Sequence, residues 1–297
     1  MLRLGRYREK GLEMGFLLVA LASIVTLAGI MVFLFSEGLP IFKKVSVQGF
    51  LLGRLWYPTS SPPDFGILPM IVASMAVMIG SSVIAVPLGV MTAIYLAEIA
   101  PNRVRELVKP AIELLAALPS VVIGFLGMIV VAPFLQEALG IPTGLNLFNA
   151  SLMLAFMSVP TIASISEDAI FSVPTSLKEA SLALGATHWE TIGRVIIPSS
   201  ISGISTAVIL GMSRAIGETM VVLMVAGGAA LIPTSIFSPV RPMTASIAAE
   251  MEESPFGGAH YHALFATGIV LFLITLVFNL VADYVSHRFR QAGEASL

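Results

Sequence analysis

The sequence contains no cysteine and very little charge. Without a thiol, the chain forms no disulfide, holds no cysteine-ligated iron–sulfur cluster and performs no thiol chemistry. Charged residues make up only 11% of the 297 residues, whereas soluble domains contain about 25%, and hydrophobic residues make up 57%. Because so few charges cannot cover a protein surface in water, the composition predicts a membrane protein.

The sequence also lacks the phosphate-binding loop of ATP-hydrolysing proteins. No lysine follows a glycine, so the pattern G-x-x-x-x-G-K-[ST] is absent. We find no nucleophile–base constellation, no carboxylate pair suited to catalysis and no nucleic-acid-binding motif. His260 and His262 alone are weak evidence for a metal site. We therefore expect no enzyme activity, no cofactor and no bound metal, and any ATPase must be another chain.

Six stretches are long enough to cross the hydrocarbon core, which needs about 20 apolar residues. They are Met14–Phe35, Leu68–Ala97, Ala111–Leu135, Ala150–Phe171, Pro198–Leu231 and His262–Val285. The second and fifth are long enough to be tilted or broken. Pro87, Pro119 and Pro160 lie inside predicted spans, which indicates either a bundle with a polar interior or simple packing kinks.

Lysine and arginine predict the orientation of the chain in the membrane. Eleven lie in the termini and in two loops, residues 98–110 and 172–197: Arg3, Arg6, Arg8, Lys10, Arg103, Arg105, Lys109, Lys178, Arg194, Arg288 and Arg290. The opposite side has four: Lys43, Lys44, Arg54 and Arg241. The excess of positive charge places both termini of this multi-pass membrane protein, with residues 98–110 and 172–197, in the cytoplasm.

Two long loops, Ser36–Ile67 and Ile232–Tyr261, then face outward. The second contains Glu250, Glu252 and Glu253, which either meet an external partner or keep a connecting loop solvated. On the cytoplasmic side, Glu167 and Asp168 could tune anion exit or pair with Lys178, and the favoured alternative is a solvated helix end.

The loop between the fourth and fifth spans predicts a short helix followed by a turn. Pro174 stops the preceding helix, and Thr175 or Ser176 can begin a new one, with Glu179 completing a capping box to Ser176. Gly185 stands where a helix ends on a glycine. A second helical turn with Trp189 leads to Pro198, and such a shape can sit in a groove of another protein.

This loop resembles the EAA loop of ABC importer permeases. Glu179-Ala180-Ser181, Gly185 and Val195-x-Ile197-Pro198 match its spacing, with conservative departures at Ser181, Val195 and Ile197. The resemblance implies that residues 172–198 form a coupling helix that fits a cleft of an ATP-binding subunit. It assigns coupling roles to Glu179, Ala180, Ser181, Gly185 and Pro198.

The fifth span contains an arginine and a glutamate four residues apart. Arg214 and Glu218 would share a face of a continuous helix, and each charge in the membrane centre costs about 2.5–3.5 kcal/mol unless it is paired or hydrated. A guanidinium suits an oxyanion such as phosphate, because it donates two parallel hydrogen bonds. The alternative is a structural salt bridge. Ser213 and Thr219, with Gly211 and Gly217, keep this part of the helix small.

Several phrases together resemble the PstC-type phosphate permeases. They are residues 35–38, 65–71, 118–125, 158–162 and 166–169, and Arg-Ala-Ile-Gly-Glu-Thr at 214–219. The resemblance implies an all-α, six-helix permease bundle of the type I ABC importers, with one domain over 1–297 and a core at 68–287. It also implies phosphate as substrate and a pathway past Arg214, Glu218, Ser213 and Thr219.

The resemblance implies a location in the inner membrane of a bacterium or archaeon. The implied partners are a PstA-type sister permease, an ABC ATPase dimer in the cytoplasm and an external phosphate-binding protein. Two other hypotheses remain open. One is a permease for molybdate, sulfate or tungstate. The other is an ion-coupled secondary transporter or channel without an ATPase, for which an inverted repeat would be typical, and none is visible.

Overall fold

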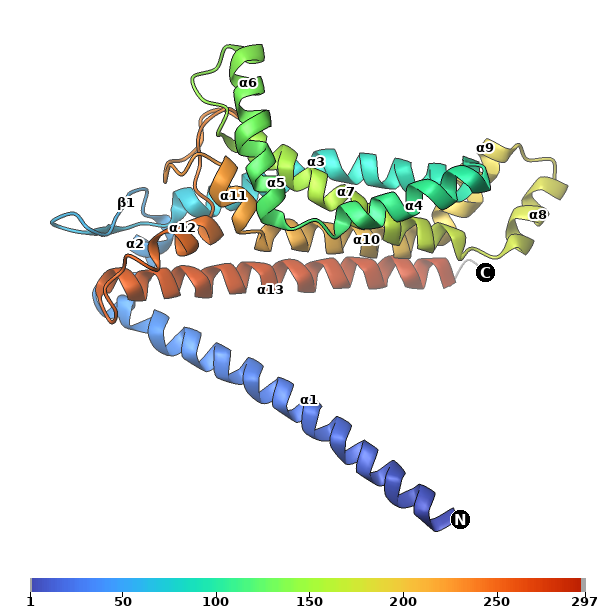
Figure 1. Ribbon diagram of the computed structural model, residues 1–297, viewed down its shortest axis with the longest axis horizontal. Coiled ribbons are helices and arrows are strands. Elements are labelled where there is room, and N and C mark those ends of the chain that lie inside the picture. The colour runs from blue at the N-terminus through green and yellow to red at the C-terminus, as the bar shows by residue number, and fades with distance from the viewer. Residues whose placement is uncertain (1, 295–297) are drawn as a thin grey trace.

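The computed structural model describes residues 2–294, and the side chains of residues 12–284. The chain is almost entirely helical, with one small hairpin (Figure 1). The α-helices are α1 (Leu2–Gly38), α2 (Val47–Leu52), α3 (Leu68–Ile94), α4 (Asn102–Ala116), α5 (Ser120–Leu126), α6 (Ala132–Leu139), α7 (Leu147–Phe171), α8 (Thr175–Ala183), α9 (His188–Thr191), α10 (Ile197–Gly217), α11 (Met220–Val225), α12 (Met243–Glu250) and α13 (Ala259–Glu294). The 3₁₀ segment η1 (Leu39–Lys43) and π-helical turns η2 (Tyr95–Ile99), η3 (Gly127–Val131) and η4 (Ile192–Ile196) extend four of them. Strands β1 (Trp56–Tyr57) and β2 (Asp64–Phe65) pair antiparallel, with Trp56 opposite Phe65.

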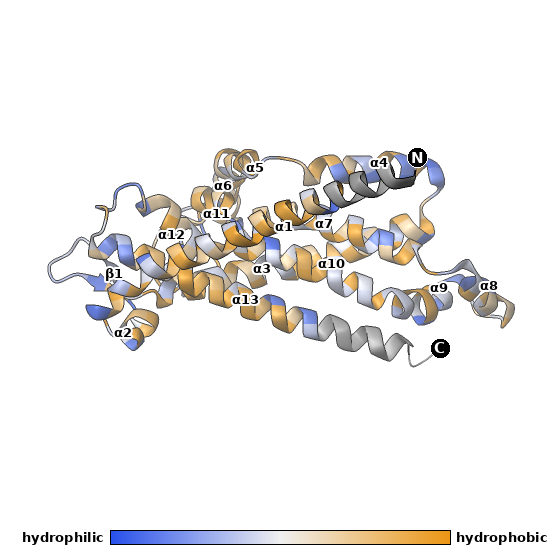
Figure 2. Ribbon diagram, turned by 90° about the horizontal axis from the view of Figure 1, so that it is seen from below, coloured by the Kyte–Doolittle hydropathy of each residue, from blue (hydrophilic) through white to orange (hydrophobic). Residues whose placement is uncertain are grey.

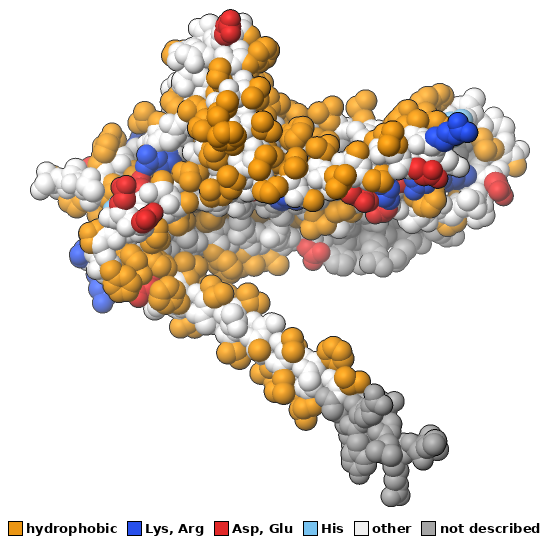
Figure 3. Space-filling model, in the orientation of Figure 1, with side chains coloured by type: hydrophobic (Ala, Val, Ile, Leu, Met, Phe, Trp, Pro, Cys, Tyr) orange, Lys and Arg blue, Asp and Glu red, His pale blue; other side chains and the backbone are white. Residues whose placement is uncertain are grey.

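The expected number of membrane-spanning segments is confirmed. Within the described residues, six helical segments are long and apolar enough to cross a membrane: Leu12–Lys43, Leu68–Ile99, Ser120–Leu139, Leu147–Phe171, His188–Gly217 and Ala259–Tyr284. Hydrophobic residues dominate the middle of the molecule, and polar ones gather toward its two ends (Figures 2 and 3). We call the end with α8 and α9 the α8 end, and the end with the hairpin and α12 the β1 end.

Helix α7 lies at the centre of the bundle and is the most buried of the spans. Helices α3 and α10 pack against it, and glycines allow the closest approach. A Cβ atom added to Gly89 of α3 or to Gly211 of α10 would lie 2.7 Å or 2.6 Å from the side chain of Ile162. Ile162 of α7 therefore fills the contact between all three helices, as small residues allow in membrane bundles.

The third span differs from its expected boundaries. Ala111, its expected start, lies within α4, which runs beside α7 at the α8 end (Figure 1). The helix stops at Ala116 because a residue before proline disfavours helical geometry, and α5 begins after Pro119. Helix α5 packs against α11, and α6 then projects away from the bundle at a steep angle (Figure 1). The apolar segment is Ser120–Leu139.

Helix α1 leaves the bundle and meets it only near the β1 end (Figure 1). There Phe33 packs edge-on against Phe265 of α13, with ring centroids 5.5 Å apart. None of the apolar window of α1 is buried against the rest of the described chain. The terminal charges used for the orientation, at Arg3, Arg6, Arg8, Lys10, Arg288 and Arg290, lie outside the described side chains.

Candidate functional site

The short helix expected after the fourth span is α8, and Gly185 ends it as predicted. Gly185 has φ +89°, a left-handed conformation that glycine adopts without strain. Its N–H donates to the carbonyl of Leu182 at 3.0 Å, and the N–H of Ala186 donates to Ser181 at 3.3 Å. This pair of bonds is the Schellman motif, which satisfies the last carbonyls of the helix and reverses the chain.

The predicted capping box at Ser176 and Glu179 is wrong. Helix α8 begins directly after Pro174, without a side-chain cap. The capping box instead begins α9. There the Glu190 N–H donates to the hydroxyl of Thr187 at 3.3 Å, and the Thr187 N–H donates to the Glu190 carboxylate at 2.9 Å. The pattern Thr-x-x-Glu at 187–190 was visible in the sequence and identifies this cap.

Helices α8 and α9 form an exposed platform, which we call the docking segment (residues 172–198). Its apolar side chains Leu184 and Trp189 are 90% and 66% exposed. Glu179, Ala180 and Pro198 are also exposed, whereas Ser181 is half-buried and shares a 3.0 Å hydrogen bond with Thr191. Such a small, capped and apolar surface is suited to a groove of another protein.

Lys178 attaches this segment to the bundle through a carboxylate of η2. It forms an ion pair with Glu98, whose side chain is only 6% exposed. The alternative pairing of Lys178 with Glu167 or Asp168 is wrong, because α4 supplies other cations there. The solvated helix end holds for Asp168, whose side chain is 66% exposed, but is wrong for Glu167. Glu167 is 1% exposed and pairs with Arg105 and, at 2.5 Å, with Lys109.

The same cations continue the contact between α4 and α7. Lys109 also contacts Asp168 at 2.7 Å, and the guanidinium of Arg105 lies 4.0 Å from the ring centre of Phe171. Burial lowers the pKa of Lys109, but the hydrogen bonds to Asp168 and Glu167 raise it by more, so its pKa lies above the ordinary value. We call Arg105, Lys109, Glu167 and Asp168 the α4–α7 clamp.

The fifth span is broken between Arg214 and Glu218, so the expectation that they share one helix face is wrong. Helix α10 ends at Gly217, and Glu218 is extended, with φ −71° and ψ 129°. Its Oε1 accepts hydrogen bonds from the N–H groups of Thr219, Met220 and Val221 at 3.1, 3.0 and 3.3 Å. The carboxylate thus satisfies the first amides of α11, which explains how a break is tolerated within the apolar region.

Arg214 is exposed on the surface of α10 inside a span. Among the described side chains it has neither a hydrogen bond nor an ion pair. Its neighbour Ser213 is half-buried and donates to Oδ1 of Asn279 in α13 at 2.7 Å. Thr219 is half-buried, and its hydroxyl lies 3.4 Å from the Gly217 carbonyl. A lone guanidinium requires a partner that is anionic or aqueous.

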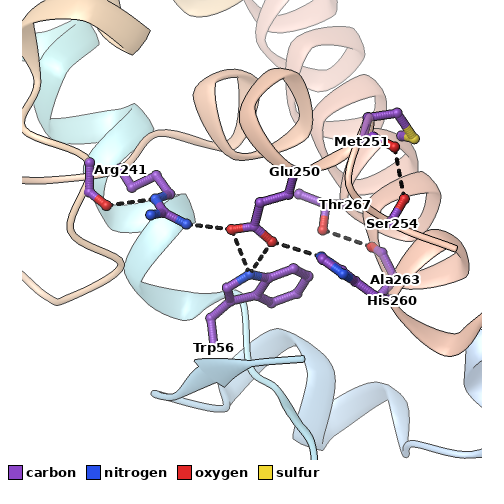
Figure 4. A network of polar contacts seen from close by, with 9 residues as sticks. Trp56, Arg241, Glu250, Met251, Ser254, His260, Ala263 and Thr267 are labelled. Carbon is purple, nitrogen blue, oxygen red and sulfur yellow. Dashed lines mark hydrogen bonds and ion pairs between the residues drawn. The ribbon is translucent and has the colours of Figure 1, made fainter. Parts of the chain in front are cut away.

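At the β1 end, Glu250 joins three distant segments (Figure 4). Its carboxylate accepts from Trp56 Nε1 at 2.9 and 3.1 Å, contacts His260 Nε2 at 2.8 Å and pairs with Arg241. Glu252 and Glu253 are exposed, so the acidic cluster divides into one structural carboxylate and two surface ones.

The two histidines of this end do not meet at a common site. His262 Nδ1 contacts the Glu37 carbonyl at 2.7 Å, whereas His260 is held by Glu250. Within the described residues, no group of three histidines and carboxylates is placed to hold a metal ion.

The fold and these sites define a class of protein, the membrane permease subunit of an ABC importer. Residues 85–291 match the family model of the binding-protein-dependent transport system inner membrane component, and the chain belongs to this family. Its fold resembles that of a bacterial alginate ABC transporter, with a TM-score of 0.62 and 18% identity over 94% of this chain and 96% of the other. The methionine transporter MetNI gives a TM-score of 0.56 and 20% identity over 75% and 94% of the two chains.

Among known proteins, several phosphate transport permeases are similar to this chain over most of its length. The chain is 36% identical to the phosphate transport system permease protein PstC of Mesorhizobium japonicum, over 91% of this chain and 87% of the relative. It is 34% identical to PstC of Haemophilus influenzae, over 92% and 91%. It is 42% identical to YqgH of Bacillus subtilis, a probable ABC transporter permease, over 91% and 88%. The sequence resemblance to PstC-type permeases is confirmed.

Proposed function

We propose that this chain is a permease subunit of an ATP-driven importer of inorganic phosphate. The observation that carries the proposal is the exposed Arg214 in the apolar part of α10, which has no partner among the described side chains. A guanidinium there is costly unless an anion or water meets it. The planar guanidinium can donate two parallel hydrogen bonds to the oxygens of a tetrahedral oxyanion. It would therefore bind such an anion in a transport pathway.

Glu218 favours phosphate over sulfate. All its hydrogen bonds to α11 use Oε1, and in the described part of the chain Oε2 has no partner. At neutral pH phosphate carries a hydroxyl that donates to a carboxylate, whereas sulfate has only acceptor oxygens. The second carboxylate oxygen of Glu218, four residues along the chain from Arg214, would therefore accept a hydrogen bond from phosphate and repel sulfate. Ser213 and Thr219 add hydroxyls on either side of the break.

The docking segment supports a separate ATPase as the energy source. Its exposed Leu184 and Trp189, and the reversal at Gly185, present a compact surface next to α7 and α10. We assign this α8 end to the cytoplasm, together with both termini, where an ATPase dimer meets it. A PstA-type sister permease would complete the pathway, and a phosphate-binding protein would deliver phosphate at the β1 end.

The proposed mechanism is alternating access. ATP binding closes the ATPase dimer and moves the docking segment, which opens the pathway outward to accept phosphate. Hydrolysis then restores the inward-open state. Phosphate alone can shift this equilibrium only by its difference in affinity for the two states, so ATP supplies the remaining bias.

The test is transport by the complete complex in vesicles. Labelled phosphate uptake should require ATP and the binding protein, and excess sulfate or molybdate should not compete. Uptake that persists without ATP would contradict the ABC mechanism and favour an ion-coupled transporter. Uptake of molybdate or sulfate in place of phosphate would refute phosphate as the substrate and would leave the assignment as an ABC importer permease intact.

Three variants test the role of Arg214 itself. Arg214→Gln should assemble normally and lose most uptake. Arg214→Lys should retain only part of it, because an ammonium keeps the charge but not the fork. Leu210→Gln is the matched control, since Leu210 is exposed one turn earlier on the same helix and should tolerate the amide. Equal uptake in Arg214→Gln and the wild type would make Arg214 a structural residue.

A further inference from the structure

One side of helix α13 is apolar, whereas the other carries polar residues within a membrane span. On one edge, Val277 and Val281 line an apolar groove of about 740 Å³ against Ile71 of α3 and Ile216 of α10. On the edge that meets Ser213 of α10, the residues are Asn279 and, one turn further along, Asp283. Val277 precedes Asn279 by two residues and points about 200° away at 3.6 residues per turn.

Asn279 has hydrogen-bonding capacity that the protein does not use. Its Oδ1 accepts from the Ser213 hydroxyl at 2.7 Å, and the side chain is exposed. Within the described part of the chain, its amide nitrogen has no acceptor. Two unpaired N–H groups facing hydrocarbon would cost several kcal/mol, so this edge of α13 requires water or a polar ligand.

The neighbours of Asn279 indicate which ligand. Ser213 immediately precedes Arg214, which has no partner among the described side chains, so two unsatisfied donor groups lie at about the same level along α10. Thr206 of α10 and Asp283 of α13 are exposed polar residues further toward the α8 end. By contrast, Leu276 and Leu280 are exposed apolar residues beside Asn279. The polar character of this edge is therefore limited to Asn279 and Asp283, and Leu276 lies one turn earlier on the same face.

We infer that Asn279 lines the anion pathway beside Arg214 and donates its amide N–H groups to the passing oxyanion. The inference rests on the proposed function and adds a second helix, α13, to the pathway wall. In this arrangement Ser213 holds the Asn279 carbonyl, which turns the amide nitrogen outward. The arginine supplies charge, and the amide supplies directed hydrogen bonds without a further charge to retain the anion.

Cysteine labelling tests where Asn279 faces, and the cysteine-free chain gives it no background. In vesicles containing the full complex, an anionic thiosulfonate reagent would be applied to Asn279→Cys and to Val277→Cys. Remaining thiols on the tagged chain would then be counted by a maleimide mass shift. We expect Asn279→Cys to react at least about tenfold faster, because a thiol in apolar surroundings is rarely ionised. Equal rates at the two positions would overturn the inference.

Ligand protection separates this inference from the proposed substrate. Inorganic phosphate should slow the labelling of Asn279→Cys, and sulfate should not. Rapid labelling that neither anion slows would overturn the placement in the anion pathway. Protection by sulfate in place of phosphate would support the pathway placement and would instead refute phosphate as the transported ion.

Asn279→Asp provides the functional test, because it distinguishes donation from packing. The carboxylate still accepts from Ser213, so the link between α10 and α13 is kept, but the N–H donors are lost and a negative charge is added. We expect assembly at wild-type levels and loss of most phosphate uptake. Asn279→Leu removes the link and the donors without adding charge, so it should lose less uptake than the aspartate. Wild-type uptake in an assembled Asn279→Asp complex would reduce Asn279 to a packing residue.

Discussion

Lys178 of the docking segment forms an ion pair with Glu98, in the turn that ends the long second span. Glu98 is nearly buried and Lys178 is 22% exposed, so the pair joins the exposed helix α8 directly to a membrane-spanning helix. If the proposed ATPase displaces α8, we expect the displacement to act on α3 through this contact.

We predict that charge reversal at either partner uncouples ATP hydrolysis from uptake. Lys178→Glu and Glu98→Lys each place like charges together, whereas the double variant restores an opposite pair. The loss of stability should be less than the roughly 3–5 kcal/mol of a fully buried pair, because Lys178 keeps some solvent. The measurement is ATP hydrolysed per phosphate imported. A double variant no better than the singles would argue against direct coupling.

The two adjacent carboxylates of the α4–α7 clamp should differ in their effect on stability. Glu167→Gln leaves Arg105 and Lys109 without their buried partner and should destabilise the protein by about 3 kcal/mol. Asp168→Asn should cost no more than about 1 kcal/mol, because the Asp168 side chain is 66% exposed. Thermal unfolding in detergent measures both. Similar midpoints for the two variants would contradict the clamp.

The clamp also has a pH dependence whose sign follows from Lys109. The pKa of Lys109 is raised in the folded chain, so folding favours its charged form. Its contribution is complete below the unfolded pKa of about 10.4 and is lost as the pH rises through the folded pKa. The thermal midpoint should therefore fall more steeply above pH 10 in the wild type than in Lys109→Met.

Glu218 should show separate effects on structure and on transport. Glu218→Gln keeps an oxygen for the α11 amides, so stability should remain while the preference for phosphate over sulfate falls. Glu218→Ala removes the cap as well and should cost about 1 kcal/mol more. Competition uptake and thermal unfolding distinguish the two effects. Unchanged selectivity in Glu218→Gln would leave Glu218 a helix cap alone.

Gly185 should be the one sensitive glycine of the docking segment. No atom lies within 4 Å of a Cβ added at Gly185 or at Gly193, so neither change creates a clash. Only Gly185 has a positive φ, and Gly185→Ala should therefore strain the turn by about 1–2 kcal/mol. We expect Gly185→Ala to reduce ATPase co-purification and Gly193→Ala to leave it unchanged. Equal yields of co-purified ATPase from the two variants would show that the turn at Gly185 is not needed for ATPase binding.

The sequence predicts the spans well because apolar length is a strong local signal. The fourth span, the second span and the helix end at Gly185 all lie within a few residues of their expected positions. The third span begins later, since proline at 119 overrides continuous hydrophobicity. The spacing of Arg214 and Glu218 predicts a pair only while the helix continues, and Gly217 with the Glu218 cap ends it.

Partners far apart in the sequence were the least predictable part of the site. Asn279 contacts Ser213, 66 residues away in the sequence. Arg105 and Lys109 of α4 contact Glu167 of α7. Each carboxylate has several cations of suitable charge on the same side of the membrane. Helix packing selects among them, and the sequence does not show this packing. An isolated asparagine in an apolar stretch is nevertheless a visible signal, and sequence reasoning passed over it.

The packing of Ile162 between Gly89 and Gly211 constrains how the molecule can deform. With so little free space at that crossing, we expect α3, α7 and α10 to resist sliding past one another. Bending should instead occur near Pro119 and Glu218, where the backbone leaves helical geometry. If these two interruptions act as hinges, Arg214 lies on the α10 side of the second.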